Sequence, residues 1–123
     1  MSEIRTFKDL VVWQKAHNAV LFVYKITKSF PQEERFALSN QLQRASVSIV
    51  SNIAERFTMR TAKDKCRFYL MAKASTMECL SQILVARDLG YIKSGVHDEL
   101  EKSLTEVAKL LTVFMRKAMG HSF

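Results

Sequence analysis

Residues 31–57 read PQEERFALSNQLQRASVSIVSNIAERF. Pro31 is favoured in the first turn of a helix, and the carboxylates of Glu33 and Glu34 complement the partial positive charge of a helix N-terminus. Apolar side chains then recur every three or four residues, the period of an amphipathic helix, at Leu38, Leu42, Ala45, Ile49 and Ile53. The stretch therefore predicts one helix that extends from Pro31 to about Phe57.

Three more helices are predicted on either side of this stretch, over residues 8–29, 61–89 and 94–118. In the third helix Thr61 and Asp64 resemble a capping box, and Gly90 suits a left-handed C-cap. Ser94 can cap the fourth helix. The apolar face expected for the first helix consists of Leu10, Trp13, Ala16, His17, Val20, Tyr24 and Thr27. The corresponding face of the third consists of Phe68, Ala72, Ser75, Thr76, Cys79, Ile83 and Ala86, and that of the fourth of Leu100, Leu104, Val107, Leu111, Phe114, Met115 and Ala118.

The composition favours a few long elements joined by short connections. Of 123 residues 48% are hydrophobic, whereas only 3 are Gly and 1 is Pro. Short connections make sequential helices run in opposite directions. The sequence therefore predicts an all-α fold with one domain, residues 1–123, built as an antiparallel up-down-up-down four-helix bundle. No run approaches the roughly 18 uncharged apolar residues of a membrane span, and the first residues have no apolar signal segment, so we expect a cytoplasmic protein without a membrane role.

Two helices carry a second apolar stripe in addition to the core stripe. In helix 61–89 it lies about 120–160° from the core stripe, at 100° per residue. Helices that are apolar on two sides usually have two partners, so these stripes predict a subunit interface and a homo-oligomer. The alternative is that wide core faces fill a broad bundle. The residues assigned to the interface are Val47, Val50, Ala54, Leu70, Met77 and Leu84, with Phe36 and Cys66 on the same stripes.

Between the apolar sides of helix 31–57 runs a polar seam. Its members fall within about 60° on a helical wheel, and we expect them to bond to polar groups of the next helix, because buried polar groups are normally satisfied by one another. The alternative is a carboxylate-lined site made by Glu55 and Glu78. The seam consists of Gln41, Ser48, Asn52 and Glu55, with Ser75 and Glu78 as partners.

No catalytic or metal-binding pattern is present in the sequence. A di-iron bundle site needs a Glu-x-x-His motif on two helices, and the chain has none. His17, His97 and His121 lack ligand spacing, and Cys66 and Cys79 lack the paired spacing of zinc or redox motifs. Nor is there a glycine-rich phosphate loop. We therefore expect no metal, no cofactor and no enzymatic activity.

The basic residues are concentrated in one segment. The chain has a net charge of +7, and residues 56–73 contain six basic side chains and one acidic side chain, Asp64. Such a concentration suits contacts to phosphates, although a solvated charged turn is the simpler interpretation. The candidate nucleic-acid contacts are Arg56, Arg60, Lys63, Lys65, Arg67 and Lys73.

Several short motifs together resemble the four-helix-bundle family named for the 23S rRNA intervening-sequence protein. They are FKDLVVWQKA at 7–16, FP at 30–31, QLQRA at 41–45, SNIAE at 51–55 and LGYI at 89–92. Where that family usually continues with Gly, an aromatic residue and Gly, this chain has Arg56, Phe57 and Thr58, which makes the turn more basic.

The resemblance implies an antiparallel four-helix bundle that assembles into a homopentamer. A related branch comprises accessory proteins of diversity-generating retroelements, which work with a reverse transcriptase and nucleic acid. Together with the charge, the resemblance favours a non-catalytic, oligomeric accessory protein that binds RNA or DNA through phosphates. The alternative is a scaffold that binds only proteins.

Overall fold

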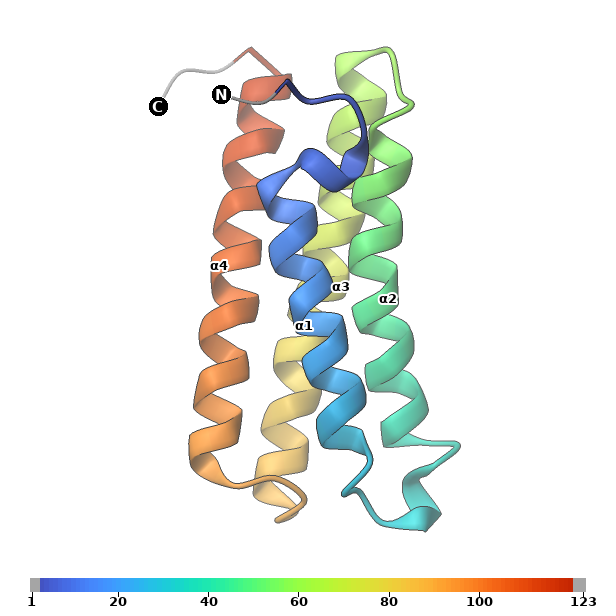
Figure 1. The fold of residues 1–123 in the computed structure, drawn as a ribbon, viewed down its shortest axis with the longest axis vertical. Helices are drawn as coiled ribbons and strands as arrows, with labels where there is room; N and C mark the ends of the chain where they lie inside the picture. The colour runs from blue at the N-terminus through green and yellow to red at the C-terminus, as the bar shows by residue number, and fades with distance from the viewer. Residues whose placement is uncertain (1–2, 121–123) are drawn as a thin grey trace.

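The computed structural model describes residues 3–120. Within that range are four α-helices and two single-turn 3-10 helices, without a strand. They are η1 (Phe7–Asp9), α1 (Val11–Thr27), η2 (Gln32–Glu34), α2 (Leu38–Arg56), α3 (Ala62–Asp88) and α4 (Ser94–Ala118). In Figure 1 the chain passes down α1, up α2, down α3 and up α4. α1 packs against α2 and α4, and α3 packs against the same two helices. The predicted all-α class with four helices is confirmed.

The core stripes predicted for α2, α3 and α4 are largely the faces that the bundle buries. Leu42, Ile49 and Ile53 of α2 are fully buried, and Leu38 is partly buried against them. In α3 the stripe is buried apart from Ser75, which is partly exposed. In α4 the stripe is buried as far as Leu111, and Phe114, Met115 and Ala118 pack at its margin.

The predicted face of α1 is rotated from the buried one, although Leu10, Ala16 and Thr27 of that face are buried. Tyr24, assigned to the core, is 42% exposed, whereas Val12 and Val23 are fully buried. Apolar residues occupy most sides of this helix, so the helical period alone does not single out one face. Packing against α2 and α4 selects the face that consists of Val12, Ala16, Ala19, Val23, Ile26 and Thr27.

The first turn predicted for the second helix is not part of α2, which begins at Leu38 rather than near Pro31. Pro31 is extended, with φ −56° and ψ 145°, and Gln32–Glu34 form η2 instead. The Tyr91 hydroxyl donates a 2.7 Å hydrogen bond to Glu34 Oε2, and the Tyr91 ring packs on Phe30 at 5.4 Å between centroids. A residue 57 positions away thus fixes this connection, which local sequence could not show.

The first helix is also shorter than predicted. η1 occupies Phe7–Asp9, and α1 covers Val11–Thr27 rather than residues 8–29. Asp9 Oδ2 accepts hydrogen bonds from the backbone N–H groups of Thr6 and Arg5, at 3.0 and 2.9 Å. These bonds lower the pKa of the Asp9 carboxyl.

The N-cap and the C-cap predicted for α3 are both present, but the N-cap predicted for α4 is not. Thr61 Oγ1 accepts a 3.1 Å hydrogen bond from the Asp64 N–H. Gly90 is left-handed, with φ +80°, and the Tyr91 N–H bonds back to the Ala86 carbonyl at 2.8 Å. The expected Ser94 cap is wrong, because Lys93 is the N-cap and no side chain caps α4.

We expect Thr61→Ala to lower the free energy of unfolding by about 1 kcal/mol, because it leaves a backbone N–H of α3 without its acceptor. Urea unfolding followed by circular dichroism measures this change. Ser94→Ala is the matched control and should have a much smaller effect, since Ser94 makes no cap hydrogen bond. Equal losses in the two variants would contradict the assignment of Thr61 as the cap.

Candidate nucleic-acid interface

One end of the bundle carries most of the excess positive charge. The C-termini of α2 and α4 and the N-terminus of α3 lie at the same end in Figure 1. There, residues 56–67 and 116–117 supply seven basic side chains and one acidic side chain. Residues 3–9, also at this end, add two of each sign, and the connections at the opposite end, residues 28–35 and 87–99, hold four basic and five acidic side chains. We call residues 56–67 and 116–117 the basic end.

A cleft of about 550 Å³ lies between these elements. Its cationic side chains come from three different parts of the chain, and two aromatic rings line it as well. The lining residues, which we call the basic cleft, are Arg56, Arg60, Ala62, Lys65, Tyr69, Phe114, Lys117 and Ala118. The fold thus brings three of the predicted phosphate contacts, Arg56, Arg60 and Lys65, to one concave surface.

Arg56 is held on one side of this cleft by an aromatic ring. Its guanidinium carbon lies 5.1 Å from the ring centroid of Tyr69, within the range of a cation–π contact. Burial raises the pKa of the Tyr69 hydroxyl, and the Arg56 charge partly offsets that rise. Arg56 Nε is buried and has no hydrogen-bond acceptor among residues 3–120.

The structure does not bring the other predicted contacts into the cleft. Arg67 lies 3.8 Å from Asp64 and stacks over the ring of Phe68, with 4.9 Å from guanidinium carbon to ring centroid. Lys63 is exposed near the start of α3 and is not part of the lining. Lys73 lies about 16 Å along the helix from Ala62, at 1.5 Å per residue, and therefore belongs to the side of the bundle.

Lys117 and Phe114 line the cleft but were not predicted as site residues. Lys117 lies outside the basic segment 56–73, and the spacing predicts Phe114 only as a core residue of the fourth helix. Phe114 is half-buried, and its ring stacks on Tyr69 with 6.1 Å between centroids and 22° between planes. The sequence does predict that the third and fourth helices run in opposite directions. This antiparallel arrangement places the end of α4 beside the start of α3, and it was the signal from which Lys117 and Phe114 could have been assigned to the site.

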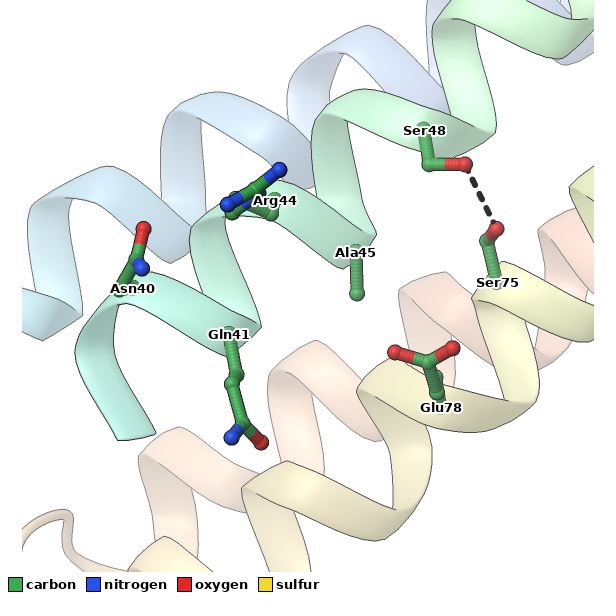
Figure 2. Close-up of a pocket in the computed structure, with 7 residues that line it drawn as sticks. All are labelled: Asn40, Gln41, Arg44, Ala45, Ser48, Ser75 and Glu78. Carbon is green, nitrogen blue, oxygen red and sulfur yellow. Dashed lines mark hydrogen bonds between the residues drawn. The ribbon is translucent and has the colours of Figure 1, made fainter. Parts of the chain in front are cut away.

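Four of the six predicted seam residues line a second cleft, of about 370 Å³, between α2 and α3 (Figure 2). The Ser48 and Ser75 hydroxyls point toward each other and are 2.8 Å apart. Asn52 Nδ2 donates to the Ser48 carbonyl at 2.8 Å and to Ser48 Oγ at 3.1 Å. The cleft is lined by Asn40, Gln41, Arg44, Ala45, Ser48, Ser75 and Glu78.

The two carboxylates of the seam are not paired into a site. Glu55 is exposed, lies outside the seam cleft and makes no side-chain hydrogen bond within the described part of the chain. Glu78 lines the cleft but is exposed as well, and Gln41 is also exposed. Of the six predicted seam residues, hydrogen bonds therefore join Ser48, Asn52 and Ser75 alone.

The remaining titratable side chains do not form a metal cluster. Among residues 3–120 no group of three or more His, Cys, Asp or Glu side chains is arranged to hold a metal ion. His97 is 1% exposed, with Nδ1 3.0 Å from Asp98 Oδ1 and Nε2 3.7 Å from Glu101 Oε2. Its burial was missed from sequence because it lies among the polar residues that begin α4. Burial raises the pKa of the Cys79 thiol to about 12, so this thiol stays neutral near pH 7.

The second apolar stripes leave large side chains in contact with solvent in the single chain. Leu70, Met77 and Leu84 follow one another at intervals of seven residues on α3 and are 56%, 46% and 38% exposed. On α2, Val47 is 38% exposed, whereas Val50 and Ala54 are half-buried. We call these six residues the α2–α3 apolar stripe. No helix within residues 3–120 is long and apolar enough to cross a membrane.

Comparison with known proteins gives one family and a shared fold. The model of the 23S rRNA-intervening sequence protein family matches residues 8–113. A similar solved structure, at 1.70 Å resolution, is a protein of unknown function from the S23 ribosomal protein family of Bacteroides thetaiotaomicron. It has a TM-score of 0.80 and 22% sequence identity, and the match covers 86% of this chain and 99% of that chain. A search of curated proteins found no match.

Proposed function

The chain belongs to the 23S rRNA-intervening sequence protein family, and on that premise we propose that it is a non-catalytic accessory protein that binds nucleic acid as an oligomer. The observation that carries the proposal is the charge asymmetry of the bundle, with seven basic side chains and one acidic side chain at the basic end. Phosphates neutralised by Lys and Arg release counterions, which supplies affinity without sequence selectivity. No base-reading constellation accompanies these cations, so the contacts we assign are to phosphates.

The oligomer of the proposal is a homopentamer of antiparallel bundles joined through the α2–α3 apolar stripe. Three large apolar side chains spaced seven residues apart on one helix suit packing against a second copy. Assembly around a closed ring would present several basic ends together and so multiply the local positive potential. The partner would be an RNA or a reverse-transcription complex, including a reverse transcriptase, in the cytoplasm.

The proposal predicts a steep dependence of binding on salt. We expect labelled RNA and DNA to bind with little sequence preference, and log affinity to fall against log salt by about 0.7 per phosphate on single strands or 0.9 on duplex. Fluorescence anisotropy between about 50 and 200 mM salt measures this slope. Arg60→Ala or Lys65→Ala should each reduce the slope by up to about one unit. Arg35→Ala, at the opposite end, is the control and should leave it unchanged. Absence of binding at the lowest salt would refute the proposal.

A second candidate is a scaffold that binds only proteins, which the exposed α2–α3 apolar stripe favours. Contacts between apolar surfaces are insensitive to salt, whereas charge-driven contacts weaken as salt screens them. Binding to a co-purified protein that persists at high salt, together with no binding to nucleic acid, would select this candidate.

A further inference from the structure

The basic cleft has the size and shape of a site for one nucleotide. Its volume of about 550 Å³ falls in the range of small-molecule sites, roughly 300–1,000 Å³. It is concave, and its lining comes from the end of α2, the α2–α3 connection, the first two turns of α3 and the end of α4. A duplex keeps its bases stacked and paired inside a convex rod, whereas a single strand can turn a nucleotide outward into a recess of this kind.

Three cations of the cleft are available to a phosphate. Arg60 and Lys117 are exposed and Lys65 is half-buried. The side chain of none of the three has a hydrogen bond or an acidic partner within residues 3–120. Arg67, in contrast, has an acidic partner, because it lies close to Asp64. An incoming phosphate would therefore not have to displace a carboxylate from these side chains.

Phe114 is the aromatic surface that a base can reach in this cleft. The other ring, Tyr69, is 2% exposed and is already covered by the Arg56 guanidinium and by Phe114. Phe114 remains half-buried at the cleft, and its stacking on Tyr69 holds it in one orientation. A ring fixed beside unpaired cations is the combination by which single-strand binding proteins hold a base and its phosphate.

We propose that the basic cleft receives one nucleotide of a single strand, with the phosphate among Arg60, Lys65 and Lys117 and the base against Phe114. This deepens the proposed function and rests on it. The protein then prefers single-stranded nucleic acid to duplex, on RNA and DNA alike, because every base presents an aromatic face.

Anisotropy titrations with labelled single strands and duplexes of the same sequence, as RNA and as DNA, test this assignment. Wild type should bind the single strands more tightly than the duplexes at equal salt. Phe114→Leu keeps an apolar side chain but removes the flat ring, and should weaken single-strand binding at least about fivefold while changing duplex binding less than about twofold. Phe114→Tyr should retain single-strand binding, and circular dichroism verifies that each variant is folded.

Phe57→Leu is the matched control, because Phe57 is also half-buried at this end but does not line the cleft. Its single-strand affinity should remain that of wild type. If single strands and duplexes bind equally well, or if Phe114→Leu and Phe57→Leu weaken binding to the same extent, the nucleotide site is wrong although the phosphate-binding function stands. If wild type binds neither form, the proposed function itself is wrong.

Discussion

Reversing three charges in the basic cleft is expected to lower nucleic-acid affinity on the order of 100-fold at low salt. The variant combines Arg60→Glu, Lys65→Glu and Lys117→Glu, which lie on three different elements and line one recess. Each reversal removes a phosphate contact and adds a repulsion, and the salt slope should fall by about three units. Anisotropy titrations at low and physiological salt measure both quantities.

A control with the same net charge separates a local site from the overall charge of the protein. Lys28→Glu, Arg35→Glu and Lys93→Glu also take the chain from +7 to +1, but they lie at the opposite end of the bundle. This control should lose only the small contribution of long-range attraction, which salt screens. If both variants lose affinity equally, binding follows net charge and the basic cleft is not a site.

Placing carboxylates in the α2–α3 apolar stripe is expected to dissociate the proposed oligomer completely. Leu70→Glu and Leu84→Glu together would bury two charges in the proposed subunit interface, at a cost of several kcal/mol for each unpaired ion. Light scattering after size exclusion should show a mass change from about 71 kDa, five chains of 14.2 kDa, to one chain at micromolar concentration. The variant should remain helical, because both side chains point away from the bundle core.

Leu21→Glu is the matched control, since Leu21 on α1 is 56% exposed, as Leu70 is. It should leave the assembled mass unchanged. Wild type that already has the mass of one chain would refute the oligomer, and dissociation by Leu21→Glu as complete as that by the double variant would refute the choice of interface.

Sequence predicts the buried faces where polar and apolar residues separate clearly around a helix. The stripe of α4 is such a case, and its core residues are identified from spacing alone. α1 is apolar on most sides, so its rotation depends on its neighbours. The start of α2 likewise depends on the hydrogen bond from Tyr91 to Glu34, which joins residues distant in sequence.

The residues of the candidate site were likewise predicted where they are close in sequence and missed where only packing brings them together. Arg56, Arg60 and Lys65 are close in sequence, so a local count of charges found them. Lys117 and Phe114 come from a helix about 50 residues further on, and only the packing of α4 against α3 brings them to the cleft. Conversely, Lys73 was included by sequence proximity, although the helical rise carries it away from the end of the bundle.

The order in which the helices pack also bears on how quickly the chain folds. Of the four pairs of α-helices in contact, three join α-helices that follow one another in sequence, and the fourth joins α1 to α4. Short loop closures lose little chain entropy, and helical proteins with mainly local contacts fold in microseconds to milliseconds. In the proposed oligomer each chain can therefore acquire its tertiary structure well before it meets other copies, so that diffusion and docking, rather than intrachain rearrangement, would limit the rate of assembly.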